Sequence, residues 1–288
     1  PVLGLFAFGR ADGVVALHRE ADASLLKSLV GRPERVTAVA FSPDGRWLAA
    51  AYQQGMVAVW PVGADAAPQW LQGPGGAPAL LRWAPDSQHL AGAFLGARTR
   101  VWRWPEAAVV ADFSPRDATK ALAFSPDGQR LAIGQQGHAK LWDLARREFV
   151  WDQALPMGAD EEAFTNVFDF SPDGRQLFAS LKRRKLFLLD AVTGRIDAST
   201  SIDASSNFSS GGFGPDGTSI VIGDYSKQAY RWTPRDSRVM SLEAHTAAVS
   251  AAVTNPQGSL IATASDDGTV KIWDAATGTV LDTLTRHR

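Results

Sequence analysis

One four-residue segment decides the fold: Ser42-Pro43-Asp44-Gly45 returns as Ser125-Pro126-Asp127-Gly128 and as Ser171-Pro172-Asp173-Gly174. Close variants are Ala84-Pro85-Asp86-Ser87, Gly214-Pro215-Asp216-Gly217 and Asn255-Pro256-Gln257-Gly258. The six prolines are spaced by 42, 41, 46, 43 and 41 residues. The segment predicts a tight turn, because proline presets φ at its second position and glycine accepts the geometry of its exit.

A second landmark follows each of these prolines by 16 or 17 residues. It occupies the positions Trp60, Trp102, Trp142, Leu189, Trp232 and Trp273. Short segments rich in Val, Leu, Ile, Phe, Trp and Ala lie between the landmarks and are bounded by turn residues, which predicts four strands in each repeat. Four-stranded units at a spacing of about 40 to 45 residues are typical of β-propellers.

The chain resembles the WD-repeat family. Its last repeat has Ala244-His245 where the family has a Gly-His pair, and Trp273-Asp274 is the dipeptide that gives the family its name. Trp142-Asp143 repeats the dipeptide, whereas the other repeats are eroded, as is common in bacterial members. The resemblance implies one buried hydrogen-bond network with a structural rather than a catalytic role. Its members would be His245, Ser265, Asp267 and Trp273.

Residues 2–30 lack the turn segment but align with the last repeat without a gap. Asp12-Gly13 falls on Asp267-Gly268, and Pro1 stands where the turn proline belongs. We therefore predict one all-β domain, a seven-bladed β-propeller of four-stranded antiparallel blades whose first blade lacks its innermost strand within this chain. The predicted blades are residues 2–30, 35–74, 77–113, 117–153, 163–202, 206–243 and 246–285.

The segment Val2–Arg10 is expected to be the edge strand of the incomplete blade. Apolar residues on both of its faces suit a strand that lies between blades, and an unpaired apolar edge is a template for strand addition. This edge is predicted to comprise Leu3, Leu5, Phe6 and Phe8. We expect a strand from outside residues 1–288 to complete the blade, supplied by sequence upstream of Pro1 or by another chain. The chain is thus expected to belong to a larger protein or complex.

Composition excludes several classes of function. With 29 basic and 30 acidic residues the net charge is −1, which argues against a large non-specific surface for nucleic acid or membrane. The absence of cysteine excludes thiol catalysis and thiolate metal sites. The five histidines lack metal-ligand spacing, and the repeated aspartates lie in separate turns. No catalytic residue, cofactor or metal is predicted, and the expected location is cytoplasmic.

The resemblance implies a non-catalytic scaffold or sensor domain that binds protein partners. Two positions per blade are expected to form the binding face: the residue after the start of the first strand, and the residue before the turn between the second and third strands. These candidates are Thr37, Gln53, Leu95, Lys120, Gln135, Asn166, Ser209, Tyr225, Ser250 and Asp266.

A basic turn, Lys182, Arg183, Arg184 and Lys185, offers a further candidate site for an acidic partner. The acidic residues 160–162 are expected on the same face of the propeller as the basic turn. The two clusters therefore either neutralise each other, or the basic turn binds an acidic partner with which the acidic residues compete. Two other functions stay open: an enzyme or cofactor-bearing propeller with a ligand in the central channel, and nucleic-acid binding through residues 182–185. Salt-dependent binding would distinguish the last of these.

Overall fold

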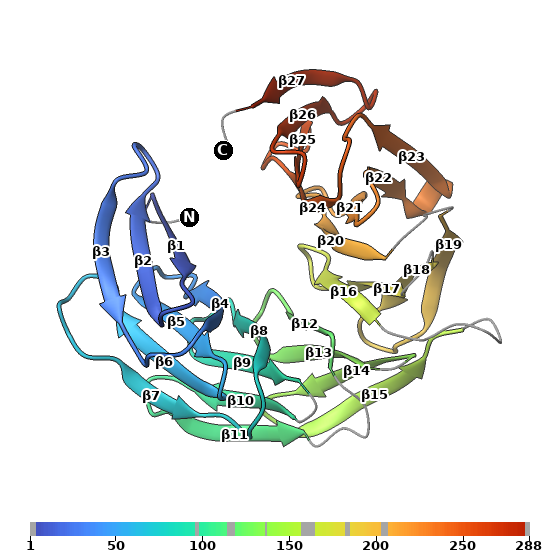
Figure 1. Ribbon diagram of the computed structural model, residues 1–288. Helices are drawn as coiled ribbons and strands as arrows, with labels where there is room; N and C mark the ends of the chain where they lie inside the picture. Colours follow the sequence, from blue (N-terminus) through green and yellow to red (C-terminus); the bar gives the residue numbers. More distant parts are fainter. Residues whose placement is uncertain are drawn as a thin grey trace. The chain divides into compact units, whose positions relative to one another are not determined.

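A computed structural model describes residues 4–95, 98–113, 119–135, 137–156, 165–181, 185–202 and 207–285, without the side chains of residues 165 and 166. In these residues the regular structure is β-strand, apart from one short 3-10 helix, η1 (Pro234–Asp236). No helix in this part of the chain is long and apolar enough to span a membrane. The strands form seven antiparallel sheets in chain order (Figure 1).

Sheet 1 has three strands, and each of the six other sheets has four, ordered from one edge to the other as in the chain. Sheet 1 comprises β1 (Leu5–Gly9), β2 (Val14–Arg19) and β3 (Leu25–Val30). Sheet 2 comprises β4 (Val36–Phe41), β5 (Trp47–Tyr52), β6 (Met56–Pro61) and β7 (Gln69–Gln72). Sheet 3 comprises β8 (Pro78–Trp83), β9 (His89–Phe94), β10 (Thr99–Arg103) and β11 (Ala108–Phe113). Sheet 4 comprises β12 (Ala121–Phe124), β13 (Arg130–Gln135), β14 (His138–Asp143) and β15 (Glu148–Ala154).

The remaining sheets repeat the same plan. Sheet 5 comprises β16 (Thr165–Phe170), β17 (Gln176–Leu181), β18 (Lys185–Asp190) and β19 (Ile196–Ser201). Sheet 6 comprises β20 (Phe208–Phe213), β21 (Ile220–Asp224), β22 (Gln228–Thr233) and β23 (Arg238–Glu243). Sheet 7 comprises β24 (Val249–Thr254), β25 (Leu260–Ser265), β26 (Val270–Asp274) and β27 (Val280–Leu284). The predicted three-stranded first sheet and the all-β fold are thus confirmed.

The chain divides into two compact units. One comprises Pro1–Leu131 with Asp143–Glu148, and the other comprises Ala132–Trp142 with Phe149–Arg288. Sheets 1 to 3 lie in the first unit and sheets 5 to 7 in the second. The arrangement of all blades as one domain, with the blade limits given above, stays a prediction.

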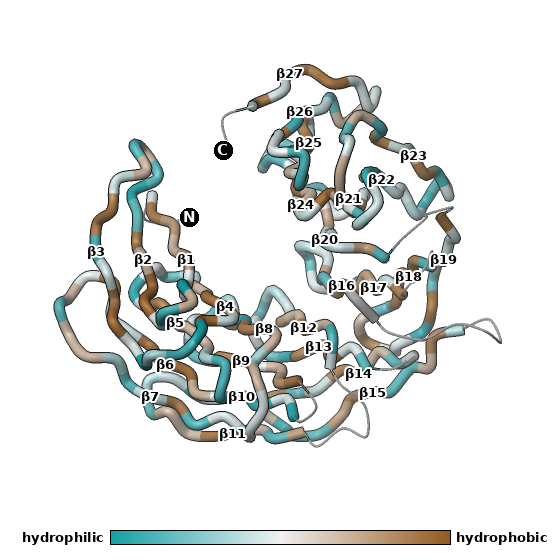
Figure 2. The backbone as a smooth tube through the Cα atoms, viewed as in Figure 1, coloured by the Kyte–Doolittle hydropathy of each residue, from teal (hydrophilic) through white to brown (hydrophobic). Residues whose placement is uncertain are grey.

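The recurring turn forms as its residues require. Ser42 Oγ donates to Asp44 Oδ1 at 2.5 Å and accepts the Trp47 N–H at 2.9 Å, so one hydroxyl closes the loop between β4 and β5. Gly45 N–H donates to the Ser42 carbonyl at 2.9 Å, and its φ of +72° is the left-handed conformation that favours glycine. In Figure 2, hydrophobic segments recur along the strands and hydrophilic segments occupy many connecting turns.

The second landmark of each repeat lies in the third strand and builds the core. Trp60, Trp102, Trp232 and Trp273 are each at most 2% exposed, and Leu189 is buried, whereas Trp142 is half-buried. Successive sheets also share hydrogen bonds: Trp83 Nε1 donates to the Ala40 carbonyl at 3.1 Å, joining sheets 3 and 2. The repeat therefore places one large apolar side chain in each sheet where two sheets meet.

Candidate functional site

The first strands carry a β-bulge at their second residue. The register shifts between Val36 and Ala38, Phe208 and Ser210, and Val249 and Ala251, with equivalent shifts in β8 and β16. A bulge leaves one residue unpaired and redirects its side chain. The bulged residues include the candidates Thr37, Ser209 and Ser250, as well as Asn166, whose side chain lies outside the described residues.

A repeated backbone hydrogen bond places the second set of candidates beside the bulges. Gln53, Leu95, Tyr225 and Asp266 each follow a second strand, and each N–H donates to a carbonyl two residues before the neighbouring bulge. The acceptors are Arg35 at 2.9 Å, Ala77 at 2.8 Å, Asn207 at 3.0 Å and Ala248 at 2.9 Å. Sheets 2 and 3 in one unit and sheets 6 and 7 in the other thus share one local geometry, which we call the bulge end.

The structure shows that some candidate residues are exposed and that one is buried within its strand. Leu95 is 48% and Tyr225 60% exposed, and Gln53 and Asp266 are exposed as well. Gln135, in contrast, is the last residue of β13 and is buried, so the expectation that it is displayed is wrong. Its position within the strand rather than beyond it explains the burial.

The hydroxyl groups at the bulges donate to backbone carbonyls. Thr37 Oγ1 and Ser250 Oγ donate to the carbonyls of Ala51 and Ala264 at 3.3 Å each, and Ser209 Oγ donates to the Val249 carbonyl. Thr37 and Ser250 thus bond within their own sheets, whereas Ser209 bonds to the first strand of the next sheet. Lys120 lies one residue before β12 and is half-buried.

The basic turn falls largely outside the described residues, which include neither Lys182, Arg183 and Arg184 nor the acidic residues 160–162. Lys185 begins β18, and its Nζ donates to the Pro156 carbonyl at 3.3 Å. In the part of the chain that the structure describes, no three His, Asp or Glu side chains are grouped to hold a metal ion.

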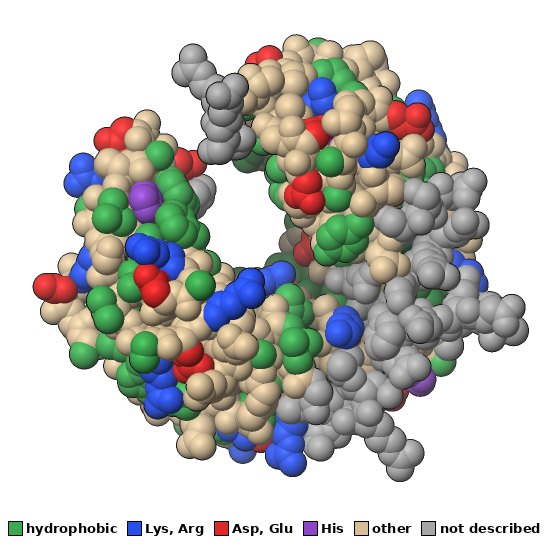
Figure 3. Space-filling model, in the orientation of Figure 1, with side chains coloured by type: hydrophobic (Ala, Val, Ile, Leu, Met, Phe, Trp, Pro, Cys, Tyr) green, Lys and Arg blue, Asp and Glu red, His purple; other side chains and the backbone are tan. Residues whose placement is uncertain are grey.

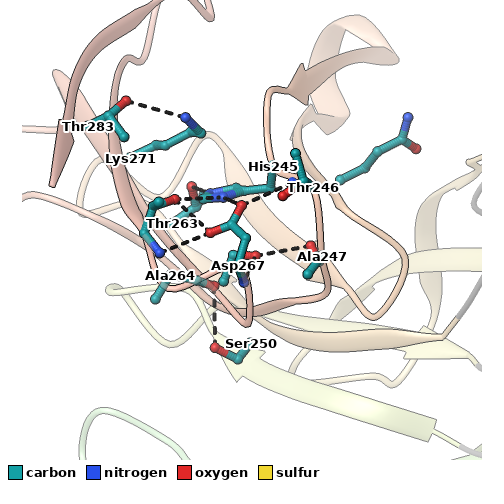
Figure 4. A network of polar contacts seen from close by, with 12 residues as sticks. His245, Thr246, Ala247, Ser250, Thr263, Ala264, Asp267, Lys271 and Thr283 are labelled. Atoms are coloured by element: carbon teal, nitrogen blue, oxygen red, sulfur yellow. Dashed lines mark hydrogen bonds and ion pairs between the residues drawn. The ribbon is translucent and has the colours of Figure 1, made fainter. Parts of the chain in front are cut away.

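A buried polar network lies in sheet 7 (Figure 4). His245 Nε2 is 2.7 Å from Thr263 Oγ1, and Trp273 Nε1 donates to the same hydroxyl at 2.8 Å. On its other side, His245 Nδ1 is 2.9 Å from Asp267 Oδ2. The His245 side chain is fully buried and that of Asp267 is 8% exposed, so the network belongs to the interior of the sheet.

Thr263, not Ser265, supplies the hydroxyl of this network. Ser265 Oγ instead donates to the Ala247 carbonyl at 3.0 Å and accepts the Asp267 N–H at 3.2 Å. Both residues point to the same face of β25, because side chains alternate along a strand. Trp273 pairs with Ile261, which brings its indole within reach of Thr263 and away from the strand end where Ser265 lies.

Hydrogen bonds set the charge state of Asp267. Burial opposes its ionisation, but the Thr246 N–H, the Thr269 hydroxyl and His245 all bond to the carboxylate and hold its pKa well below the ordinary value. Asp267 is therefore a carboxylate that anchors the start of the repeat and the turn after β25.

Replacing Asp267 by Asn should reduce the free energy of unfolding by about 1 kcal/mol at neutral pH. Because the folded pKa lies below the unfolded value of 3.8, the unfolded chain takes up protons first as pH falls. The stabilisation is complete above that value and is lost as pH falls through the folded pKa. Urea unfolding of both proteins between pH 7 and pH 3 should show the difference shrinking below about pH 4; a difference independent of pH would contradict this role.

Three arginines that the sequence analysis did not single out have their backbones close to the bulge end of the first unit. Val36 N–H donates to the Arg10 carbonyl at 3.1 Å, and the Arg35 carbonyl accepts from Gln53. The backbone of Arg32 packs directly against Gly13, beside Arg10. All three arginines are exposed, and we call them the arginine cluster.

The neighbouring carboxylates leave two of these guanidinium groups without an ionic partner. Arg10 Nη2 is 3.0 Å from Asp12, and Glu34 accepts the Gln54 N–H at 2.8 Å. Arg32 lies over the Trp70 ring at 5.3 Å from its centroid, a cation–π contact. Within the described residues neither Arg32 nor Arg35 forms an ion pair. The sequence signal for the arginine cluster was the linker Gly31–Arg35, which carries two arginines, together with a third arginine, Arg10, at the turn after the first strand.

Comparisons with known proteins show which families and folds this chain is similar to. Residues 23–61, 112–143 and 236–274 match the WD domain, G-beta repeat family. Angio-associated migratory cell protein of Canis lupus familiaris is 24% identical over 97% of this chain and 67% of its own length. Human Striatin-4 is 26% identical over 60% of this chain. The alignment spans only 24% of Striatin-4, about a quarter of its length.

Among solved structures, the β-propeller domain of Cps50 (Swd1) from Myceliophteria thermophila superimposes with a TM-score of 0.74. The match covers 94% of this chain and 93% of that domain at 16% sequence identity, which shows the fold. The seven sheets are thus the blades of a β-propeller. Three of its repeats also match the WD domain, G-beta repeat model.

Proposed function

We propose that this chain is a non-catalytic protein-interaction platform, a scaffold or sensor domain that binds partners through the bulge ends of the blades in each of its two units. The observation that carries the proposal is the repeated geometry of four sheets, which displays Gln53, Leu95, Tyr225 and Asp266 from rigid strand ends. Rigid elements that present exposed side chains in a fixed order suit recognition of another protein. The repeats of the family support the same proposal.

Two further functions, an enzyme or cofactor-bearing propeller and a nucleic-acid binder, find no specific support in the described residues. A cytoplasmic location stays a prediction that cell fractionation can test. The bacterial character expected from the eroded repeats also stays a prediction, and the relatives named above are from animals.

The arginine cluster indicates the chemistry of one partner of the first unit. Arg32 and Arg35 are exposed, and guanidinium groups form bidentate hydrogen bonds with carboxylates. We propose that an acidic protein segment binds here. We also propose that the partners of this chain include a strand from outside residues 1–288 that pairs with the edge of β1.

Charge reversal tests the acidic partner. A fluorescent hexaglutamate peptide should bind the chain with an affinity that falls as salt rises, because exposed charges are screened. The double variant Arg32→Glu/Arg35→Glu should weaken this binding at least tenfold. The matched control, Arg146→Glu/Arg147→Glu, reverses two adjacent exposed arginines in the turn between β14 and β15 and should leave the affinity unchanged. Equal affinities for both variants, measured by fluorescence anisotropy, would refute the assignment.

A further inference from the structure

In the first unit, side chains of the last strands reach the following sheet. Lys27 Nζ, in β3, donates to the Ala64 carbonyl at 3.0 Å, and Gln69 Nε2, in β7, donates to the Pro105 carbonyl at 3.4 Å. Both acceptors lie in the turn between the third and fourth strands of the next sheet. One side chain of sheet 1 and one of sheet 2 thus bridge to their neighbours at this turn.

The second unit fills the same position with large side chains. Trp151, in β15, donates from Nε1 to the Ala191 carbonyl at 3.3 Å, and its ring lies against Gly194, where a Cβ atom would be 2.7 Å from the indole. Met240, in β23, lies in the same way against Gly278, where a Cβ atom would be 2.9 Å from its sulfur. Both glycines belong to the turn between the third and fourth strands of the next sheet, which these side chains cover.

Between sheets 5 and 6 the corresponding side chain is an alanine. The turns before β15 and β19 are closed in the same way, because the N–H groups of Arg147 and Gly194 each donate to the carbonyl four residues earlier at 2.9 Å. Trp151 and Ala198 follow these donors by four residues each, so Ala198 has the place of Trp151. The corresponding residue of β11, Ala111, is also small, but it is buried, whereas Ala198 is only half-buried. The short side chain therefore leaves open space between sheets 5 and 6.

A cavity of about 470 Å³ occupies this space. Its apolar wall consists of Leu188 and Ala198 from sheet 5 and Pro234 from η1 of sheet 6. Its other lining residues are Gln176, Asp197, Gly217, Thr218 and Arg235. A mainly apolar wall with a few polar side chains, in a volume between about 300 and 1000 Å³, is typical of small-molecule sites.

The polar groups of the cavity differ in their partners. Asp197 Oδ1 is 2.9 Å from Arg195 Nη2, so its charge is already paired. The guanidinium of Arg235 and the side-chain amide of Gln176, in contrast, form no hydrogen bond or ion pair with any residue that the structure describes. A guanidinium group prefers a carboxylate, to which it can donate two parallel hydrogen bonds. The cavity is therefore suited to a ligand with a negative charge.

The cavity lies at the end of sheets 5 and 6 opposite to the bulge end. Thr218 belongs to the turn between the first and second strands of sheet 6, and Arg235 to the turn between its third and fourth strands. Figure 3 shows acidic and basic side chains scattered among uncharged ones on the face that it draws, and the net charge of the chain is −1. Selection of an anion therefore depends on a local site and not on a general positive field.

We infer that the cavity between sheets 5 and 6 binds a small aromatic carboxylate. Its ring lies against the apolar wall beside Ala198, as the indole of Trp151 lies against the turn of sheet 5. Its carboxylate pairs with Arg235, and the amide of Gln176 is a further donor. The inference goes beyond the proposed function, because this site lies away from the bulge end and needs no protein partner.

A titration with indole-3-propionate, followed by two-dimensional amide NMR of the full chain, tests the inference. We expect a dissociation constant of about 1 mM or lower, as for other small ligands in preformed pockets, and shifts centred on the cavity. Ala198→Trp, which supplies the side chain of Trp151, should abolish binding. Arg235→Gln should weaken binding about fivefold or more. The matched control Arg146→Gln changes an exposed arginine in the corresponding turn of sheet 4 and should leave the affinity unchanged.

Circular dichroism establishes that each variant is folded, and Ala198→Met, which supplies the side chain of Met240, is a smaller second variant that should also weaken binding. The inference is wrong if indole-3-propionate does not shift the cavity signals, or if folded Ala198→Trp and Ala198→Met both keep the original affinity. Equal binding of tryptamine, the cationic analogue, would contradict the role of Arg235. Much tighter binding of the peptide acetyl-Trp-Glu-amide would assign the cavity to a protein segment instead. Binding of hexaglutamate should be unchanged in Arg235→Gln, so the two proposals are tested separately.

Discussion

Replacing Gly13 by alanine is expected to reduce the free energy of unfolding by about 3 kcal/mol, since two costs combine. A Cβ atom at Gly13 would lie 1.6 Å from the Arg32 carbonyl oxygen, so the backbone of the linker must move. The φ of Gly13 is also +88°, a conformation that strains any residue with a side chain. Movement there would disturb the hydrogen bond from Tyr52 Oη to the Gly13 carbonyl, 3.1 Å long, that ties sheet 2 to sheet 1.

Two other glycines separate these costs. Gly75 has a φ of +102° with open space around its Cβ position, so Gly75→Ala should show the conformational strain alone, about 1 kcal/mol. Gly63 has neither a crowded Cβ position nor a positive φ, and Gly63→Ala should change stability by less than about 0.5 kcal/mol. Urea unfolding of the three variants measures the order. If Gly13→Ala reduced the free energy of unfolding no more than Gly75→Ala, the close approach of the Arg32 carbonyl to Gly13 would add no steric cost, which would contradict this prediction.

Thr263→Val should cost about 2 kcal/mol, because it removes a buried hydroxyl and keeps the shape of the side chain. This hydroxyl is 2.7 Å from His245 Nε2 and 2.8 Å from Trp273 Nε1, so both ring nitrogens would lose their partner inside the sheet. A buried polar group without a partner bears its full desolvation cost. Thermal unfolding with circular dichroism gives the loss.

Ser265→Ala is the matched control for Thr263→Val. It removes a hydroxyl on the same face of the same strand, two residues away, whose contacts are the backbone groups of Ala247 and Asp267. We expect a loss of less than about 1 kcal/mol. If Ser265→Ala reduced the free energy of unfolding more than Thr263→Val, Ser265 rather than Thr263 would be the hydroxyl of the network. Binding of hexaglutamate should be unchanged in both variants, because the network has a structural role.

The choice between these two hydroxyls marks a limit of the sequence. Thr263 and Ser265 have the same chemistry and lie on one face of β25, so the pattern of the strand admits either of them. The offset of β26 decides, because it brings the indole of Trp273 opposite Ile261 and next to Thr263. That offset is fixed by how β25 and β26 pair across the turn between them, and the residue pattern of β25 alone does not specify it.

The sequence by itself determined the repeated unit, since proline and glycine in the turns and tryptophan in the third strands act through local conformation and burial. These landmarks predicted six sheets, and the gap-free alignment of residues 2–30 with the last repeat predicted the three-stranded sheet 1. Tertiary structure alone decided which groups are accessible. Gln135 is buried, the backbone groups of Leu5, Ala7 and Gly9 point away from β2, and the linker that carries Arg32 and Arg35 packs against the turn after β1. Of the other residues predicted at the edge of β1, Phe6 and Phe8 direct their backbone groups to β2, and Leu3 lies outside the described residues. The physical reason is that turns and strand periodicity depend on residues close together in the sequence. The register of strand pairing and the contacts between distant loops depend on strands far apart in the sequence.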